Sequence, residues 1–540
     1  MRKLRTVFFL FLGVSLFSPS FLKAQIQYSV NNLLRYGDGR EYLGGLEPKK
    51  EYIENLTNVR LFWKDFTVGF RYLYDNPPEF GPRFTGLKKR YVEFERSGLQ
   101  IRAGDFYTLY GRGLAMNLFE NRGINYDTGL DGLRGSYQGD YFNAIFAAGK
   151  FEYVDLLNPQ LIEPYTVRSG NIEIKPFSFL RFGGSFVHVD GDIPNQSYAS
   201  SVKANIPEYN LSVSWKGIDL TASYAKKNSF IERTFQSTGI IESFERSGEG
   251  IYGSLSYSGD AGYGVTVEYK DYRFDKVAPN QRTPNRDTRM LPMQNPPTVM
   301  KEHSFTLLTR APHIIDFNDE IGFQIDAFYQ LTPELTLNLN GAAASRHESY
   351  VKDPATNRIR VNERTKFFPS MKSDYAPYWE AYVEGEYYFT DESYLRIAAD
   401  RRYDLTNDFL VPKVVSSFTV PMRLEYMLSA PYSIAVNLEL QWVNDQSLRE
   451  TPKHSNQFLA LTFTKAPQWA LTVRTEMTSN EEDPSKKKFW AAGEATYRLG
   501  NAHTLTASYG SERGGLICAS GICRQVNPFS GFRLTVLSQI

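Results

Sequence analysis

The chain has 540 residues, with 61 lysines and arginines against 60 aspartates and glutamates, and a net charge of +1. This balance disfavours a nucleic-acid partner, because proteins that bind the phosphate backbone carry a basic surface. Aromatic residues make up 15% of the chain, which is typical of proteins with aromatic girdles at membrane interfaces. Beyond the first 24 residues no apolar run approaches the roughly 20 residues of a membrane-spanning helix, which excludes a helical membrane protein.

Residues 1–24 have the features of an export signal. Basic residues at positions 2, 3 and 5 precede an apolar run from Val7 to Phe17, and Ala24 offers a small residue for cleavage. An uncleaved anchor is the alternative, but the run is shorter than the roughly 20 residues that a spanning helix needs. We therefore expect a single mature unit of residues 25–540 in an oxidising compartment.

From residue 27 onward, runs of roughly ten residues alternate between apolar and polar side chains, as in barrel strands. In Pro431–Trp442 every second residue from Ile434 is apolar, and the residues between are small or polar. Since successive side chains of a strand point to opposite faces, each run predicts a strand with one apolar face. The predicted strands are Gln27–Tyr36, Asn58–Lys64, Thr67–Tyr74, Arg90–Arg96, Gln100–Tyr110, Gly132–Gln138, Phe142–Phe151, Val167–Ile174, Leu180–Val189, Tyr209–Trp215, Leu220–Lys226, Ile251–Tyr257, Gly264–Tyr272, Gly322–Gln330, Leu335–Ala344, Tyr378–Phe389, Tyr394–Tyr403, Ser416–Leu428, Ser433–Val443, Gln457–Phe463, Ala470–Met477, Phe489–Leu499, Thr504–Gly510 and Phe532–Ile540.

The connections between these runs alternate between tight turns and long polar segments. Turns such as Ser97-Gly98 and Gly500-Asn501 join the two strands of a hairpin, and longer segments join one hairpin to the next. About 24 strands in this order predict an all-β fold. It is a large antiparallel transmembrane β-barrel with short periplasmic turns and long extracellular loops. Such barrels are typical of the outer membrane of Gram-negative bacteria, so the lipid of that membrane is an expected partner.

The alternation also separates a lipid face from a lumen face. Outward positions are expected at Val265, Val267, Leu339 and Phe418. A cationic side chain facing lipid would cost roughly 2–4 kcal/mol at the midplane, so charged residues of the strands are expected to face the lumen. Candidates for a lumen or constriction site are Arg396, Asp400, Arg402, Arg423 and Glu425. Because both signs occur side by side, a salt-bridged, water-filled interior is favoured over a selectivity ladder for one charged solute.

Two long connections carry features that suggest function. Phe274–Asp319 is the longest and contains six prolines; it either folds into the lumen and constricts it or forms an exposed crown. Gly111–Gly129 contains an apolar run from Leu114 to Phe119, which should pack against the inner wall. Its charged residues are further constriction candidates, with simple loop packing as the alternative: Arg112, Glu120, Arg122 and Asp127.

The two cysteines, Cys518 and Cys523, lie in the last outer loop and are separated by four residues that include a glycine. In an oxidising compartment we expect a disulfide, with a redox or metal role as the alternative. The six histidines are scattered outside any metal-binding pattern, and the nucleotide-binding and serine-hydrolase motifs are missing. We therefore expect no metal, no cofactor and no enzymatic activity, although a catalytic site assembled at the rim stays open.

Two segments, Arg102–Gly132 and Gly514–Arg524, resemble a family of uncharacterised outer-membrane proteins of Bacteroidota and related bacteria. The resemblance extends over nearly all of the mature chain and supports the barrel fold and its location. The family is catalogued as a domain of unknown function, so the resemblance implies no substrate. The first strand is expected close to the mature start, with no plug domain before it, and this disfavours energised import.

Three functions remain from the sequence. The leading one is a porin-like channel for the passive passage of solutes, since a barrel of this size encloses a wide lumen. The second is a partner-dependent barrel, a sheath or docking platform for a periplasmic or surface protein in secretion, attachment or electron transfer. The third is an enzyme at the outer rim.

Overall fold

The computed structural model describes residues 26–540, apart from residues 44, 155–160, 195–197, 260–261, 276–290, 311, 353–355, 357–358, 366, 409–410 and 520. The expected export signal, residues 1–24, lies outside the described residues. Within them, 24 strands form one antiparallel sheet, which closes on itself where β1 (Gln27–Glu41) pairs with β30 (Phe529–Gln539). The strand pattern therefore predicted both the fold and the strand number.

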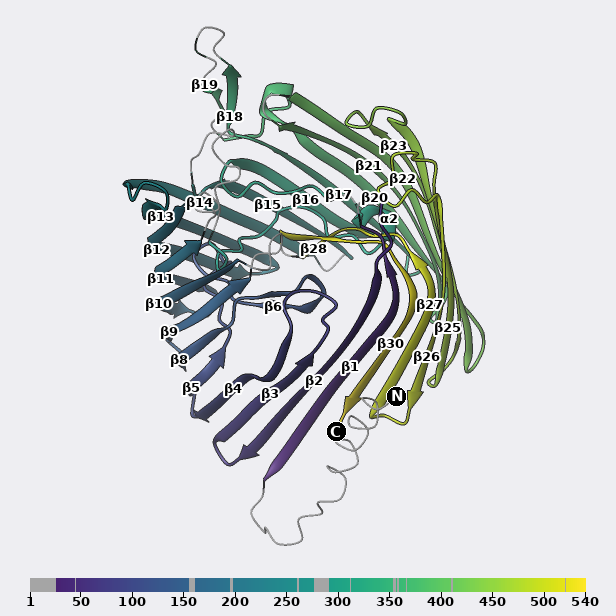
Figure 1. Cartoon of the computed structure of the whole chain (residues 1–540), viewed down its shortest axis with the longest axis horizontal. Helices are drawn as coiled ribbons and strands as arrows, with labels where there is room; N and C mark the ends of the chain where they lie inside the picture. Colours follow the sequence, from purple (N-terminus) through teal and green to yellow (C-terminus); the bar gives the residue numbers. More distant parts are fainter. Residues whose placement is uncertain are drawn as a thin grey trace.

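The remaining strands of the barrel follow one another around the ring in chain order (Figure 1). They are β2 (Lys49–Trp63), β3 (Phe66–Asp75), β4 (Phe84–Arg96), β5 (Leu99–Phe106), β8 (Leu130–Gln138), β9 (Phe142–Val154), β10 (Ile162–Phe177), β11 (Leu180–Pro194), β12 (Tyr198–Trp215), β13 (Ile218–Phe235), β14 (Ile241–Gly259), β15 (Tyr263–Arg273), β16 (Glu320–Gln330), β17 (Leu335–Ser345), β20 (Tyr378–Thr390), β21 (Ser393–Asp408), β22 (Val411–Ser429), β23 (Tyr432–Asp445), β24 (Lys453–Lys465), β25 (Trp469–Thr478), β26 (Phe489–Leu499) and β27 (His503–Glu512).

Short elements occupy the longer connections. They are the hairpins β6 (Glu120–Asn121) with β7 (Tyr126–Asp127), β18 (Glu348–Lys352) with β19 (Ile359–Arg364), and β28 (Gly515–Ala519) with β29 (Ile522–Val526), the single-turn helix α2 (Thr306–Thr309), and the 3-10 turns η1 (Arg122–Ile124) and η4 (Ser373–Tyr375). Among the described residues, no helix is long and apolar enough to cross a membrane.

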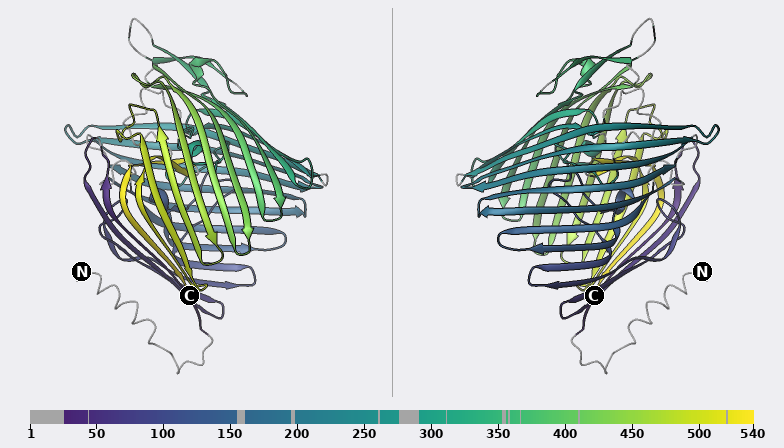
Figure 2. Two further views of the ribbon diagram at one scale, coloured as in Figure 1. Left: turned by 90° about the vertical axis from the view of Figure 1, so that its right-hand side faces the viewer. Right: turned by 90° about the vertical axis from the view of Figure 1, so that its left-hand side faces the viewer.

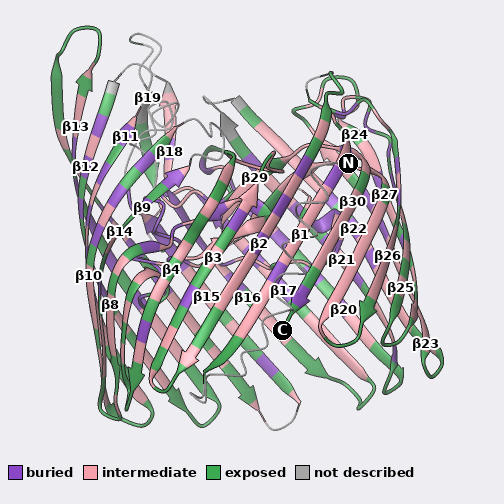
Figure 3. Ribbon diagram, turned by 60° about the horizontal axis from the view of Figure 1, so that its bottom comes forward, coloured by how far each residue is buried: buried purple, intermediate pink, exposed green. Residues whose placement is uncertain are grey.

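The two ends of the barrel differ. The start of β1 pairs with the end of β2, and the end of β30 pairs with β1 at the same level, so both outer strands end beside the tight turns. Figure 2 shows these turns gathered at the end of the molecule where the C-terminus lies. The long connections gather at the opposite rim (Figure 3). We call these the turn end and the loop end.

Side chains alternate between the two faces of the wall as predicted. In β15, Val265 and Val267 lie on the outer face with more than a third of each side chain exposed, whereas Lys270 points inward and is 1% exposed. Leu339 and Phe418 also lie outward. Figure 3 shows buried and exposed residues interleaved along the strands, and exposed residues at the turns. The chain therefore has the apolar outer face and charged inner face of an outer-membrane barrel.

The apolar outer face ends below the loop end. On β9 and β11 the outward side chains of Phe146 and Phe186 are about half exposed or more. Further toward the loop end, the outward positions of β10 and β11 carry Arg168 and Asp190, which form an ion pair of 2.9 Å. Above this level the wall is polar on its outer face as well, so the strands extend beyond the apolar layer.

This extension corrects several predicted boundaries. β13 and β14 have 18 and 19 residues, and only residues 236–240 connect them, where the sequence indicated a long loop. The hydrophobic alternation ends near Lys226 because both faces of the wall become polar there, but strand pairing continues. In contrast, β5 ends at Phe106 rather than at Tyr110, because the chain leaves the wall there and turns into the lumen.

Aromatic rings cover glycines of neighbouring strands. Tyr52 lies opposite Gly37 and Tyr91 lies opposite Gly69. A Cβ atom on either glycine would lie 2.2 Å from a carbon of the facing ring. Glycine therefore lets the ring lie flat on the inner wall, an arrangement that pins the register of neighbouring strands.

Candidate functional site

The lumen is the candidate site, because segments of three long connections fold into it (Figure 1). The first inward loop, residues 107–129, leaves the wall after β5 and returns at β8. Its residues Leu114, Ala115 and Met116 are fully buried and belong to one hydrophobic cluster with wall residues of β10 to β12. The wall residues in this cluster include Val167, Val187, Val189, Ala204 and Ile206. The predicted packing of this loop against the inner wall is therefore confirmed.

A single carboxylate holds the backbone of this loop. Glu208 of β12 is fully buried, and its Oε2 accepts a hydrogen bond from the Ala115 N–H at 3.1 Å. Gly111 has a φ of 50°, and a Cβ atom there would lie 2.2 Å from Glu208 Oε1. The glycine thus permits both the left-handed turn and the close approach of the carboxylate. A negative group in a concave turn of backbone amides is the arrangement expected for tight anchoring.

The second inward loop, of which residues 274–275, 291–310 and 312–319 between β15 and β16 are described, packs on the first. The Asn117 N–H donates to the Met293 carbonyl at 2.7 Å, and the Gln294 side-chain amide donates to the Leu114 carbonyl at 2.9 Å. Met293 and Gln294 are buried. The two loops therefore form one packed unit inside the barrel, and the prediction that the longest connection constricts the lumen is favoured over an exposed crown.

The second inward loop then crosses to the opposite wall. At the start of α2, the N–H groups of Thr306 and Leu307 donate to the two oxygens of Glu439 on β23, at 2.8 and 2.7 Å. Arg310 follows α2 and pairs with Glu476 of β25. Glu439 is 1% exposed. Because free N–H groups at the start of a helical turn favour an anion, Glu439 fixes α2 to the wall.

Buried ion pairs complete this attachment. His313 of the loop lies 2.9 Å from Asp404 of β21 and 3.4 Å from Glu320, and Lys270 lies 2.6 Å from Glu320. Burial alone would lower the pKa of His313, but the carboxylates of Asp404 and Glu320 outweigh it and raise this pKa to about 9. His313 is therefore a cation at neutral pH that joins the loop to the wall.

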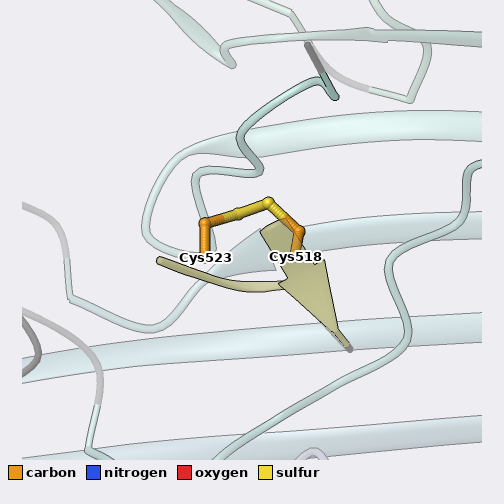
Figure 4. The surroundings of a disulfide bond; sticks show 2 residues. All are labelled: Cys518 and Cys523. Carbon is orange, nitrogen blue, oxygen red and sulfur yellow. A yellow bond between two sulfur atoms is a disulfide. The ribbon is translucent and has the colours of Figure 1, made fainter. Parts of the chain in front are cut away.

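The third inward segment is the hairpin of β28 and β29, which lies within the ring of strands (Figure 1). A disulfide joins Cys518 and Cys523 across this hairpin, as the sequence predicted (Figure 4). The segment contacts both inward loops: Arg310 donates to the carbonyl of Arg513, which precedes β28, at 2.9 Å, and Arg524 of β29 donates to the Ile124 carbonyl at 3.2 Å. The cysteines were expected in an outer loop, but the segment folds inward.

A cavity of about 750 Å³ remains between the inward loops and the walls formed by β1 to β5 and β9 to β12. Three of the predicted constriction residues line it, each paired with a wall residue. Glu120 lies 2.7 Å from Arg71, Asp127 lies 2.7 Å from Lys89, and Arg122 pairs with Glu54. Burial would raise the pKa of Asp127, but the Lys89 ammonium outweighs it and lowers this pKa.

The structure does not bring all the candidate residues together. Arg112 donates to Thr221 at 3.3 Å, apart from the cavity. Arg396 lies 2.5 Å from Glu386, and Arg423 pairs with Glu425 on its own strand. These three pairs are salt bridges or hydrogen bonds of the inner wall. They are of the kind expected for a salt-bridged interior.

Asp400 and Arg402 lie deeper in the packing, at the contact of β20 and β21 with the second inward loop. Arg402 binds Glu380 at 2.6 Å, and Asp400 is fully buried. Sequence reasoning missed Glu208, Glu439 and Glu380, which hold the loops. The only sequence signal for these glutamates is that each occupies an inward-facing position of its strand. The loop residues that they contact lie 77 or more positions away in the chain.

One known protein family matches nearly the whole chain. The model of a family of unknown function, DUF6029, matches residues 6–540. No curated protein matches the chain. The match confirms the resemblance to an uncharacterised family and does not test its bacterial group.

Several solved structures resemble the chain at low similarity. The siderophore receptor PirA from Pseudomonas aeruginosa is 8% identical, with a TM-score of 0.46 over 96% of this chain and 81% of that one. The copper transporter OprC is 10% identical, with a TM-score of 0.46 over the same shares. The unliganded ferric citrate transporter FecA is 10% identical, with a TM-score of 0.42 over 95% and 79%.

Proposed function

The chain belongs to the DUF6029 family of unknown function, and on that premise we propose that it is an outer-membrane channel for the passive passage of small polar solutes. The observation that carries this proposal is the lumen itself. A closed ring of 24 strands, apolar outside and charged inside, encloses a cavity of about 750 Å³ beside loops that fill only part of it.

The charges that line the cavity affect which solutes it accepts. Arg71, Lys89 and Arg122 line it together with Glu120 and Asp127. Each of these cations has a carboxylate within pairing distance. Because these three cations are each neutralised by a neighbouring carboxylate, this part of the lining offers little net field to one sign of ion, which favours uncharged or zwitterionic solutes.

Liposome swelling tests this proposal. Liposomes that contain the purified barrel are placed in isotonic solutions of a neutral sugar, a zwitterionic amino acid, and a salt of equal osmolarity. We expect swelling above that of empty liposomes, faster for the small neutral and zwitterionic solutes than for larger sugars. Swelling equal to that of empty liposomes, with a correctly folded barrel, contradicts a channel.

A second candidate function is a barrel that works with a protein partner. One observation favours it: at the loop end, Phe367 and Phe368 are each more than 70% exposed and Met371 is half exposed. Exposed apolar residues that lie together are typical of protein contact sites. This second function would be supported by a barrel that passes no solute in liposomes on its own. Adding a defined partner would then make it conduct or change its protease sensitivity.

A further inference from the structure

A second cluster of polar side chains lies where the second inward loop meets β20 and β21. His303 of the loop, Glu380 of β20 and Asp400 of β21 each place one imidazole nitrogen or carboxylate oxygen within 4.8 Å of the other two. The His303 side chain is 4% exposed, and those of Glu380 and Asp400 are fully buried or nearly so. No local sequence pattern indicated this cluster, since its histidine lies 77 residues from the nearer acid.

The two carboxylates differ in their partners. Both carboxylate oxygens of Glu380 have hydrogen-bond partners. Its Oε1 lies 2.8 Å from His303 Nε2 and 2.6 Å from Arg402 Nη2, and the Tyr378 hydroxyl donates to its Oε2 at 2.8 Å. Both oxygens of Asp400 are buried, and in the ionised form neither has a donor among the described residues, whereas a proton on Asp400 would be shared with Glu380. A buried carboxylate without a donor is strongly unfavourable and requires a proton or a cation beside it.

The charges of the cluster also favour a bound cation. If both carboxyls are ionised, Glu380 and Asp400 carry two negative charges, and Arg402 supplies one positive charge. With His303 as neutral imidazole, one negative charge remains in a dry site. An imidazole and two carboxylates are the ligands of Zn²⁺ and related dications, whereas Mg²⁺ and Ca²⁺ prefer oxygen alone.

We propose that His303, Glu380 and Asp400 bind a transition-metal dication of the Zn²⁺ class, which holds the second inward loop on the barrel wall. Two ligands of a tetrahedral zinc, each about 2.0–2.1 Å from the metal, lie roughly 3.3 Å apart. The 2.8 Å contact of His303 and Glu380 would open by about half an ångström, and atoms of the cluster that lie up to 4.8 Å apart would close by about 1.5 Å. Arg402 and Tyr378 then act as outer partners that orient Glu380.

Metal content tests this proposal independently of any channel activity. Tag-free, folded barrel in detergent is stripped with a chelator, incubated with ZnCl₂ and desalted. The metal in each chain is then measured by mass spectrometry. We expect one zinc per chain in the wild type and a loss of that zinc in Asp400→Asn and in His303→Gln. Zinc should also slow amide exchange across Thr306–Thr309 in the wild type.

Asp404→Asn is the matched control, because Asp404 lies on the same strand and pairs with His313 of the same loop. It should retain the zinc. Wild-type protein that retains none would overturn the proposal and show that a proton neutralises the carboxyl pair instead. Equal zinc in wild type and His303→Gln would overturn it as well. Since His303 lies outside the sheet, that variant serves if Asp400→Asn does not fold.

Discussion

At the scale of single residues, two buried glutamates set the position of the inward loops. Glu208 accepts from the backbone of the first loop, and Glu439 accepts from two successive amides of the second. Removing an acceptor leaves a buried N–H group without a partner, which costs about 1–3 kcal/mol. Each glutamate is therefore a point at which one substitution can release a loop while the wall stays intact.

Glu439→Gln tests this dependence. The amide keeps the size of the side chain, but only one of its two polar atoms can accept, so one amide of α2 loses its partner. We expect exchange of the Thr306 and Leu307 amides to accelerate roughly 5- to 150-fold, in line with a cost of about 1–3 kcal/mol. Hydrogen exchange followed by mass spectrometry measures this directly.

Glu386→Gln is the control for that substitution, because Glu386 pairs with Arg396 on the neighbouring strand. It should leave exchange at α2 unchanged. Unchanged exchange in Glu439→Gln itself would contradict the role assigned to this carboxylate.

A single histidine gives the loop a dependence on pH. Burial opposes the charge of His313, but Asp404 and Glu320 raise its pKa to about 9, above the roughly 6.5 of an unfolded chain. A raised pKa means that the stabilisation is complete below pH 6.5 and is lost as the pH rises through about 9. We expect the stability difference between wild type and His313→Gln to shrink over this range. A difference that stays constant from pH 6 to pH 10 would be contrary to this account.

At the scale of elements, the sequence predicts strands well wherever one face meets lipid. The alternation in β15 and β23 marks both faces, and the structure follows it. It fails in β13, where Lys226, Lys227 and Asn228 give polar residues on both faces, yet the strand continues to Phe235. Outside the apolar layer, backbone pairing and a few inward contacts such as that of Ile231 maintain the strand, and these leave no periodic signal in the sequence.

The inward loops were predictable only in part. The apolar run from Leu114 to Phe119 indicated packing because such residues are costly to expose. Nothing local indicated that Glu208 and Glu439 would hold the loops, since these contacts join residues 93 and 132 or more positions apart. Contacts between distant segments depend on the closed ring, which brings opposite walls to the same space.

The disulfide hairpin allows a prediction at this scale. A crosslink that closes so short a loop stabilises its segment by about 2 kcal/mol on the chain-entropy model. We expect Cys518→Ser with Cys523→Ser to loosen the hairpin and to speed tryptic cleavage after Arg513 and Arg524. Cleavage after Arg449, in the connection between β23 and β24, serves as the internal reference. Equal rates in both proteins would mean that the hairpin is held by its contacts with the inward loops alone.

At the scale of the whole molecule, the barrel combines a wide wall with an internal partition. A ring of 24 strands is larger than the barrels of 16–18 strands that leave an aqueous channel, so loops are needed to narrow it. The second inward loop spans the lumen from the first loop to Glu439 on the opposite wall. This loop is therefore expected to be the main resistance to flow through the lumen.

Single-channel conductance in a planar bilayer tests that central claim most directly. One variant replaces residues 276–318 with a short Gly-Ser linker. A control variant shortens the hairpin of β18 and β19, two strands that stand above the rim (Figure 1). The account predicts that the first variant conducts severalfold more than the wild type and that the control conducts the same. Equal conductance in all three proteins, or a correctly folded barrel that stays silent without the loop, would contradict it.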